Sequence, residues 1–522
     1  MYSNKENVNI LTALLVAHGV RHAVVCPGSR NAPIVHNLNE CPDIQCYPVT
    51  DERSAGFYAL GMTQCIQQPV VVCVTSGTAL LNLAPAVAEA YYQHRPLVVI
   101  SADRPQQWID QLDGQTLPQP DALGRFVRRA VSLPEPHDAD TRWYCNRLVN
   151  EALMERHAPV HINVPISEPL FDFTVASLPV ERKIALTPAD MPPHVLSHVC
   201  RMFMQAKRPM LIAGQPMNPL YDEAVRLVGN DDPRYVPDFV LYTGGSIVSK
   251  HLKHFLRKAK ETWVVNETGE VTDTFQNLTH VLQGDADVVV DQLRFLLEQQ
   301  PHPFVQLWAE LLAKLQAHAD AFQPGYSQMA AVKFLVHSSE FRVHSSAFTF
   351  HYANSSAIRL ANIYARHPVY CNRGVNGIEG SLSTAAGFSC VADHPVCCVI
   401  GDLSFFYDQN ALWNQNLRGN LRILLLNNGK GGIFNMLPGL EQSPARDKLV
   451  AAEHHTTAAG ICQQNDILYL KAENQDELPQ AVRSLLTIDS PRPVLLEVFT
   501  DADADQQAYS DYSLSVCHEV QK

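Results

Sequence analysis

Residues 396–404, VCCVIGDLS, are an apolar run that ends in Gly401-Asp402-Leu403-Ser404. A second apolar run, residues 421–426, ends in Asn427-Asn428-Gly429-Lys430. Both runs are typical of strands in a parallel sheet covered on both faces, because such strands carry apolar side chains on both sides. The carboxyl ends of neighbouring parallel strands meet at one edge of the sheet, where ligands bind. The pattern therefore predicts an α/β fold with Asp402 and Asn428 at a shared edge.

Asp402 and Asn428 would bring a carboxylate and an amide oxygen to that edge. Both are hard oxygen ligands of the kind that Mg²⁺ takes together with phosphate oxygens. Gly401 has no side chain, so a diphosphate could approach the backbone closely there. Aspartate and asparagine are also common in strand-end turns that bind nothing, and the pattern alone leaves that alternative open.

Short apolar runs alternate with helical patterns along the rest of the chain, which is typical of parallel sheets with helices on both faces. A polar stretch with prolines near residues 178–193 and the sequence Gln323-Pro324-Gly325 mark two boundaries. We therefore predict three doubly wound parallel-sheet domains, residues 1–178, 190–322 and 326–522. The predicted strands are residues 23–26, 70–74, 96–101 and 160–164 in the first domain, 210–213, 263–265 and a strand ending at 282 in the second, and 369–372, 396–400, 421–426 and 494–499 in the third.

The composition excludes several classes of protein. The 522 residues carry 40 basic and 53 acidic side chains, a formal net charge of -13, and no basic stripe, which argues against binding to nucleic acid. No run reaches the roughly 18 apolar residues of a membrane span, and the polar start MYSNKENVNI lacks the apolar region of a secretory signal. The 13 cysteines include no C-x-x-C pair, which favours reduced thiols. We expect a cytoplasmic protein without membrane insertion.

A second charged motif, Thr50-Asp51-Glu52-Arg53, lies at a predicted strand-to-helix junction. We expect Glu52 in the first turn of the helix, near the positive end of the helix dipole. An acidic residue at a helix start is common, so this motif alone does not indicate a site.

Together, the two motifs resemble the thiamine-diphosphate enzymes, in which a pyrimidine-binding domain, a central domain and a diphosphate-binding domain follow one another. The resemblance implies a thiamine-diphosphate-binding fold, with Mg²⁺ or Mn²⁺ held by Asp402, Asn428 and the backbone carbonyl of Lys430. It implies that Glu52, sheltered from water, hydrogen-bonds the aminopyrimidine ring and activates the cofactor. Ile378 matches the aliphatic residue that supports the bent cofactor. The other residues implied to bind the cofactor are Thr78, Gly401, Ser404 and Phe434.

Five further motifs occur in a fixed order, namely residues 26–33 (CPGSRNAP), 75–79 (TSGTA), 101–105 (SADRP), 372–380 (NRGVNGIEG) and 431–434 (GGIF). With the two motifs above, they closely resemble the carboligase family of menaquinone biosynthesis over the full chain. The resemblance implies that 2-oxoglutarate loses CO₂ and that its succinyl unit adds to isochorismate in a 1,4-addition.

Both substrates are dicarboxylates, so a chain of negative net charge needs cations gathered locally, and arginine suits bidentate carboxylate binding. The resemblance implies Gln115 as a catalytic residue that positions substrate or a proton-bearing water. It implies substrate binding by Ser29, Arg30, Arg104, Lys250, Ser355, Arg359 and Arg373.

Four residues depart from the family pattern. Gly114 stands where some relatives have asparagine, Asn31-Ala32 replaces a more usual Ser-Thr, and Lys430 stands where glycine is common. With Gly114, the substrate contact of that asparagine would be lost or replaced. Lysine at position 430 is tolerable, because only the backbone carbonyl there is needed to bind the metal.

Two alternatives remain. The first is another thiamine-diphosphate decarboxylase or carboligase, against which the large cationic set argues. The second is a catalytically silent protein on the same fold, against which Glu52, Asp402 and Asn428 argue. In the family, the domains that carry Glu52 and Asp402 meet across a subunit interface, so the resemblance implies a homodimer or homotetramer with composite sites.

Overall fold

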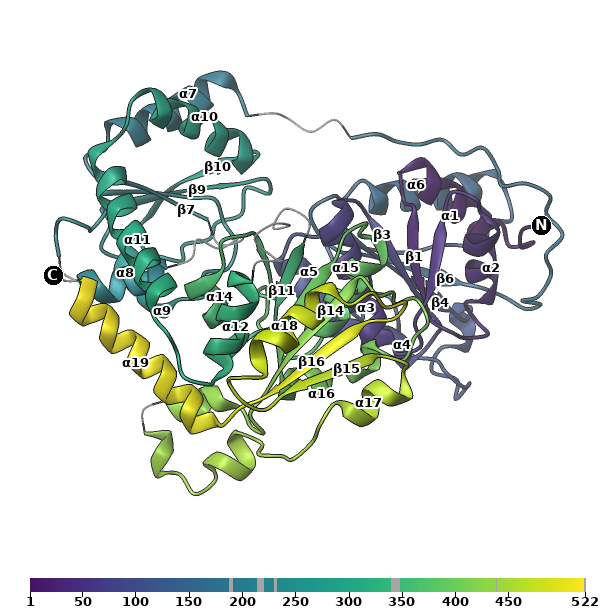
Figure 1. The fold of residues 1–522 in the computed structure, drawn as a ribbon. Helices are drawn as coiled ribbons and strands as arrows, with labels where there is room; N and C mark the ends of the chain where they lie inside the picture. The colour runs from purple at the N-terminus through teal and green to yellow at the C-terminus, as the bar shows by residue number, and fades with distance from the viewer. Residues whose placement is uncertain (187–190, 214–219, 230–231, 339–347, 438, 521–522) are drawn as a thin grey trace.

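The computed structural model describes the chain except for residues 187–190, 214–219, 230–231, 339–347, 438 and 521–522. Its strands form three sheets, two of six strands and one of four, and neighbouring strands are parallel throughout. Figure 1 shows the N-terminal sheet in purple, the central sheet in teal and the C-terminal sheet in green to yellow. The predicted α/β fold with three parallel sheets is confirmed. Each sheet lies within one predicted domain, whose boundaries remain a prediction.

The N-terminal sheet has the strand order β2-β1-β3-β4-β6-β5 and is covered on both faces. Alternate residues of its strand β3 belong to different apolar clusters, with Val70 and Val72 on one side and Val71 on the other, all fully buried. Its strands are β1 (His22–Val25), β2 (Gln45–Pro48), β3 (Val70–Val74), β4 (Leu97–Asp103), β5 (Arg129–Ser132) and β6 (Val160–Pro165). Its helices are α1 (Glu6–Ala17), α2 (Ala32–Glu40), α3 (Glu52–Ile66), α4 (Thr78–Asn82), α5 (Ala84–Tyr92) and α6 (Ala139–Leu153).

The central domain is smaller, with the strand order β10-β9-β8-β7. Its strands are β7 (Pro209–Ile212), β8 (Phe239–Tyr242), β9 (Glu261–Asn266) and β10 (Leu278–Gln283). Its helices are α7 (Pro193–Gln205), α8 (Tyr221–Val228), α9 (Lys250–Leu256), α10 (Ala286–Gln299) and α11 (Pro303–Ala321).

The C-terminal sheet has the order β12-β11-β13-β14-β16-β15. Its strands are β11 (Thr349–Tyr352), β12 (Val369–Tyr370), β13 (Val396–Gly401), β14 (Leu421–Asn427), β15 (Leu468–Ala472) and β16 (Val494–Phe499). Its helices are α12 (Gln328–His337), α14 (Ser356–Tyr364), α15 (Ser381–Val391), α16 (Asp402–Tyr407), α17 (Ala459–Gln464), α18 (Leu478–Thr487) and α19 (Ala502–Val520). Strand β12 is shorter than the predicted 369–372.

The two terminal sheets repeat one topology, since renumbering β11–β16 from one gives the strand order of the N-terminal sheet. In both sheets, the connection after the first strand leads towards one edge of the sheet and the connection after the third strand leads towards the other edge. In such sheets, ligands bind in the crevice at the carboxyl ends of the two strands where the connections diverge. The crevices lie between β1 and β3 and between β11 and β13. Loops follow the first three of these strands and begin at Cys26, Thr75 and Ala353, whereas β13 leads directly into α16 at Asp402. Several of the predicted site motifs lie at these four strand ends.

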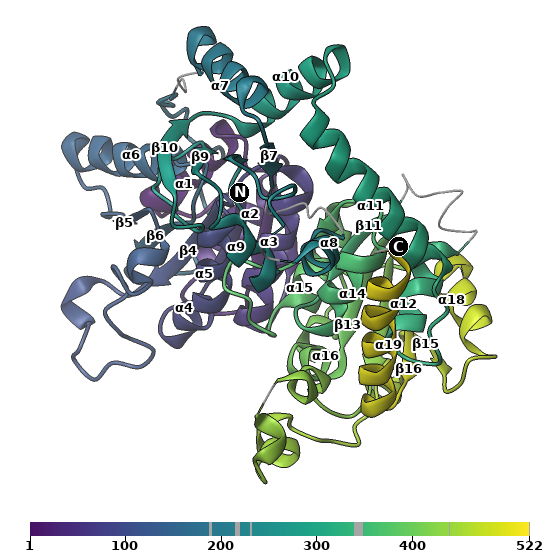
Figure 2. The same cartoon turned by 90° about the vertical axis from the view of Figure 1, so that its left-hand side faces the viewer.

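Helices α3 and α15 join the two terminal domains, and one apolar cluster spans both sheets. The helices touch through glycines, because a Cβ on Gly61 would lie 1.9 Å from the carbonyl oxygen of Thr384 and one on Gly387 would lie 2.1 Å from that of Tyr58. Another cluster joins the central and C-terminal domains, and α19 runs along that junction. Figure 2 shows α19 beside α12 and α8.

The thirteen cysteines are all free, which agrees with the predicted reduced thiols. Adjacent Cys397 and Cys398 belong to opposite faces of β13, so they pack in different clusters. Within the described parts of the chain, no helix is both long enough and apolar enough to cross a membrane.

Candidate active site

The ends of strands β13 and β14 lie side by side, with Gly401 paired to Leu426. Asp402 follows β13 as the first residue of α16 and is 4% exposed. Its Oδ2 accepts hydrogen bonds from the backbone N–H groups of Asn428 at 3.1 Å and Gly429 at 2.9 Å. The carboxylate and the Asn428 amide therefore share one edge of the sheet, as expected from the sequence.

This edge fits a metal bound to a diphosphate. A Cβ on Gly401 would meet no atom within 4 Å, so the space beside the strand end is open. Burial raises the pKa of the Asp402 carboxyl, although the backbone N–H groups around it oppose the shift. Among the described residues, no three His, Cys, Asp or Glu side chains are grouped so that they could hold a metal ion by themselves. The oxygen donors at this edge, the Asp402 carboxylate and the Asn428 amide, are of the kind that Mg²⁺ takes together with phosphate oxygens.

His454 lies beside Asp402, although none of the sequence motifs includes it. Its Nε2 lies 3.6 Å from Asp402 Oδ2 and is buried with no hydrogen-bond partner among the described residues. Its backbone N–H donates to the carbonyl oxygen of Gly429 at 2.7 Å, which fixes the loop beside the edge. The only sequence signal was the adjacent pair His454-His455.

The loop after β11 crosses the same crevice. Ser355 precedes α14 with a φ of +74°, a left-handed conformation that is uncommon for serine. Asn354 donates through Nδ2 to the carbonyl oxygens of Asn372 and Gly377, both at 2.7 Å, and its Oδ1 accepts from Arg373 Nη1 at 3.0 Å. Asn354 thus ties the loop that carries Arg373 to the crevice.

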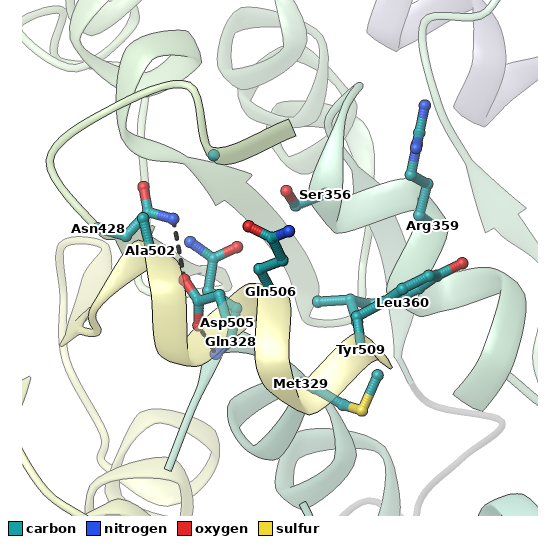
Figure 3. A pocket seen from close by; sticks show the side chains of 11 residues that line it. Gln328, Met329, Ser356, Arg359, Leu360, Asn428, Ala502, Asp505, Gln506 and Tyr509 are labelled. Atoms are coloured by element: carbon teal, nitrogen blue, oxygen red, sulfur yellow. Dashed lines mark hydrogen bonds between the residues drawn. The ribbon is translucent and has the colours of Figure 1, made fainter. Parts of the chain in front are cut away.

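Arg359 lies one turn into α14 and lines a small cavity, about 40 Å³, together with Asn428 and Tyr509. Figure 3 shows this cavity between α14, α12 and α19, with Asn428 at one end and Arg359 at the other. The structure therefore brings one predicted substrate residue close to one predicted metal ligand.

Helix α9 of the central domain approaches the same region. Ser249 caps it by accepting from the backbone N–H of Leu252 at 3.0 Å, which leaves Lys250 in the first turn. Burial and the positive charges of Arg373, Arg257 and Lys250 lower the pKa of Lys253. Burial and the charge of Arg359 likewise lower the pKa of Arg373. These cations therefore share one electropositive region.

Three predicted cofactor or metal residues flank the edge. Ser404 Oγ donates to the carbonyl oxygen of Ile378, so α16 is tied to the loop after β12. Phe434 lies in a short 3-10 helix, Gly432–Met436, with its ring against Gly431. Lys430 directs Nζ towards Asp447 Oδ1 at 3.6 Å, and its backbone carbonyl accepts from the N–H of Gly432 at 2.8 Å.

The N-terminal domain carries a second set of predicted residues. Glu52 is the first residue of α3, as expected, and Asp51 caps the helix through the N–H of Ser54 at 3.2 Å. Glu52 is half-buried in the single chain, and its Oε2 accepts from Asn82 Nδ2 at 3.1 Å. Thr78 begins α4 directly after the loop from β3.

Gln115 lies against this loop, because its backbone is 3.3 Å from where a Cβ on Gly77 would be. The N–H of Gly77 donates to Gln119 Oε1 at 2.7 Å, which anchors the loop around residue 115 to the strand end. A Cβ on Gly114 would meet nothing within 4 Å, so the departure from asparagine there leaves open space.

Two arginines that were predicted to bind substrate form ion pairs with carboxylates of the same chain. Arg30 is 6% exposed and donates to the carbonyl oxygen of Ile166 at 3.1 Å and to Glu168 Oε1 at 3.2 Å. Arg104 forms an ion pair with Asp113 at 2.9 Å. Ser29, beside Arg30, is exposed.

The site residues of one chain therefore form two separate sets, one on the N-terminal domain and one on the C-terminal and central domains. Among the described residues, no hydrogen bond or ion pair joins a member of one set to a member of the other. The first set is Ser29, Arg30, Glu52, Thr78, Arg104 and Gln115, and the second is Lys250, Ser355, Arg359, Arg373, Ile378, Gly401, Asp402, Ser404, Asn428, Lys430 and Phe434.

Apart from Lys250 of the central domain, the two sets lie within two known domains. Residues 6–123 match the thiamine pyrophosphate enzyme N-terminal TPP binding domain, and residues 354–498 match the corresponding C-terminal TPP binding domain. Fold and site thus define a thiamine pyrophosphate enzyme.

Relatives that match over nearly the full length show to which family of thiamine pyrophosphate enzymes the chain belongs. The chain is 44% identical to the 2-succinyl-5-enolpyruvyl-6-hydroxy-3-cyclohexene-1-carboxylate synthase of Bacteroides thetaiotaomicron, over 98% of this chain and 99% of the relative. It is 42% identical to the synthase of Phocaeicola vulgatus, over 98% of each chain, and 34% identical to that of Porphyromonas gingivalis, over 96% of this chain and 95% of the relative. The chain belongs to the 2-succinyl-5-enolpyruvyl-6-hydroxy-3-cyclohexene-1-carboxylate synthase family.

Proposed function

We propose that this chain joins 2-oxoglutarate to isochorismate in menaquinone biosynthesis, with loss of CO₂, to give 2-succinyl-5-enolpyruvyl-6-hydroxy-3-cyclohexene-1-carboxylate. The observation that carries the proposal is the cationic region beside the Asp402–Asn428 edge. Among the described residues, Lys250, Arg359 and Arg373 form no ion pair with a carboxylate. Because like charges crowded together need anions to neutralise them, the region suits dicarboxylate substrates better than pyruvate-like ones.

The C-terminal half would hold the cofactor. Asp402, the Asn428 amide oxygen and the Lys430 carbonyl would bind Mg²⁺ or Mn²⁺, while Gly401 and Ser404 would lie along the diphosphate. When bound, thiamine diphosphate would supply a carbon nucleophile for the oxo carbon of 2-oxoglutarate and a group that takes up the electron pair left when CO₂ departs. Ile378, Thr78 and Phe434 would shape the space that orients the cofactor.

The N-terminal half would supply Glu52, which would hold a proton at the aminopyrimidine ring. Ser29, Arg30, Arg104 and Gln115 would bind and orient isochorismate. Arg30 and Arg104 are restrained by Glu168 and Asp113, so their positions are organised before substrate arrives.

The two half-sites support a homodimer or homotetramer, in which Glu52 of one subunit faces Asp402 of another. We place the enzyme in the cytoplasm, where its free cysteines stay reduced.

A substrate comparison tests the activity. Purified protein with Mg²⁺ and thiamine diphosphate should consume 2-oxoglutarate rapidly only when isochorismate is present, with the adduct identified by mass spectrometry. Turnover of pyruvate without isochorismate would instead support a general decarboxylase.

Glu52→Gln tests the mechanism. We expect turnover to be lost while metal-dependent cofactor binding, followed by tryptophan fluorescence, stays measurable. Activity at the wild-type level in this variant would overturn the role of Glu52.

A further inference from the structure

Asp505 is a half-buried residue at the start of the C-terminal helix α19, and its carboxylate accepts three hydrogen bonds. Its Oδ1 accepts from the backbone N–H of Gln328 at 2.7 Å. Its Oδ2 accepts from Thr500 Oγ1 and from Asn428 Nδ2, both at 2.9 Å. Figure 3 shows Asp505 on α19 with its hydrogen bonds to Gln328 and Asn428 as dashed lines. The three donors come from α12, the end of β16 and the loop after β14.

An ionised carboxylate only accepts hydrogen bonds, so it can bind the NH₂ group of the Asn428 amide but not its oxygen. The amide must turn its NH₂ group to Asp505 and its oxygen the other way. That oxygen has one long contact, 3.4 Å from the N–H of Lys430, and so keeps lone pairs available for a further ligand.

The neighbouring Asn427 shows the contrast. Its Nδ2 also donates to a carboxylate, Glu497 Oε1, at 2.7 Å, but its Oδ1 accepts from the N–H of Gly429 at 3.1 Å. Asn427 is thus satisfied on both ends within the protein. A carboxylate sets the orientation of each amide. The hydrogen bond to the amide oxygen is longer in Asn428, at 3.4 Å, than in Asn427, at 3.1 Å.

We propose that Asp505 is a positioning residue for the metal–diphosphate site, which holds the Asn428 amide with its oxygen turned towards the metal. The inference rests on the proposed ligand role of Asn428. Groups that orient a metal ligand in this way typically change metal affinity by roughly 10- to 100-fold when removed. Asp505 lies beyond residues 354–498, the C-terminal cofactor-domain match, so α19 adds to the site an element outside that match.

The test is cofactor binding without substrates. For wild-type protein, Asp505→Asn and Asp505→Ala, tryptophan fluorescence would follow Mg²⁺ titration at a fixed, saturating concentration of thiamine diphosphate. We expect the half-saturating Mg²⁺ concentration to rise roughly 10- to 100-fold in both variants. Asp511→Asn is the matched control, because it removes a carboxylate from an exposed position on the same helix and should bind Mg²⁺ as the wild type does.

Asn428→Ala separates the two ideas. If Asn428→Ala keeps wild-type Mg²⁺ dependence, the proposed ligand set is wrong and the inference is lost with it. If Asn428→Ala weakens Mg²⁺ binding but both Asp505 variants do not, the inference alone is overturned. The melting temperature of the cofactor-free protein, measured in parallel, detects unfolding. A lowered melting temperature with an unchanged Mg²⁺ requirement in Asp505→Asn would assign Asp505 a purely structural role and overturn the proposal.

Discussion

Glu89 is a buried carboxylate of the N-terminal domain that holds a loop of the C-terminal domain. It lies on α5 and is 2% exposed. Its Oε1 accepts from the backbone N–H of Gly374 and its Oε2 from that of Val375, both at 2.7 Å. Hydrogen bonds to an ionised acceptor are stronger than those between neutral groups, so Glu89 fixes the backbone directly after Arg373.

Glu89→Ala should therefore reduce catalysis without touching a substrate. The change leaves two N–H groups without their acceptor, and the loop with Arg373 should shift. We expect kcat/KM for the two substrates to fall roughly 10- to 100-fold, with a rise in KM, as loss of charged hydrogen bonds implies. Steady-state kinetics with each substrate varied in turn measures the effect.

Gln93→Ala is the control for this change. It removes the bond from Gln93 Nε2 to Glu89 Oε1, at 2.5 Å, and the bond that Gln93 Oε1 accepts from Gln64 Nε2, at 2.8 Å, but it keeps both backbone contacts of Glu89. Unchanged kinetics in Glu89→Ala would show that the loop is held by other contacts.

At the scale of the elements, long apolar strands were predictable, whereas five strands of the three sheets were missed, namely β2, β5, β8, β11 and β15. Strand β3 is buried along its whole length, and its apolar run made it visible in the sequence. Edge strands β2, β5 and β15 carry exposed positions and mixed composition, so no continuous apolar run marks them. Strand β11, Thr-Phe-His-Tyr, contains the polar but buried His351, so its sequence has no continuous apolar run. Strand β8, Phe-Val-Leu-Tyr, is apolar and as short as the predicted strand β7, so its length does not explain why it was missed.

The same distinction applies to the candidate site. Residues at strand ends, such as Asp402 and Asn428, sit beside recognisable apolar runs. Glu89, His454 and Asp505 reach the site through folding contacts from other elements, and Glu89 is 285 residues from its partner Gly374. No local pattern marks such residues, because their partners are set by the packing of whole domains.

The α3–α15 contact depends on two glycines that bring helix backbones together. Gly61→Ala would place a methyl group 1.9 Å from the Thr384 carbonyl oxygen, which is backbone and cannot move aside alone. We expect a loss of at least about 1–3 kcal/mol, the usual range for overpacking, and a lower melting temperature by calorimetry.

Gly460→Ala provides the matched comparison. Gly460 lies in helix α17, and a Cβ there would meet nothing within 4 Å. Because alanine favours helix over glycine by roughly 1 kcal/mol, this variant should be as stable as the wild type or more so. Equal melting temperatures for Gly61→Ala and the wild type would mean that the two helices can separate freely.

For the whole molecule, the junction between the central and C-terminal domains should make stability depend on pH. Glu223 on α8 is 5% exposed, and its Oε2 has no hydrogen-bond partner among the described residues. Burial, with a smaller contribution from Asp222, raises the pKa of Glu223 from 4.5 to about 8, while Arg226 opposes the shift. The tyrosines facing it are Tyr364, Tyr509 and Tyr512.

Between pH 4.5 and about 8 the folded chain keeps a proton on Glu223 that the unfolded chain has released, so stability falls as pH rises through this range. Glu223→Gln removes this titration. We expect the variant to melt several degrees above the wild type at pH 9 and close to it at pH 5. Asp408, whose pKa burial raises to about 6, acts in the same direction in both proteins. The exposed Glu298→Gln is the control, and parallel melting curves for Glu223→Gln and wild type across pH would contradict the prediction.

The separation of the two half-sites within one chain leads to a test of assembly. Glu52→Gln and Asp402→Asn should each be inactive as homo-oligomers, because each lacks one half of every site. In a mixed dimer with composite sites, Glu52 from one subunit would meet Asp402 from the other, so one site of the two would be intact. Co-expressing both variants with different affinity tags and purifying through both tags should therefore recover about half of wild-type activity per dimer.

If each site were built within one chain, every site in the mixed dimer would carry a substitution and the doubly purified protein would stay inactive. Mixing the two purified homo-oligomers briefly, before subunits exchange, gives the baseline, so activity that appears only after co-expression reports the shared site.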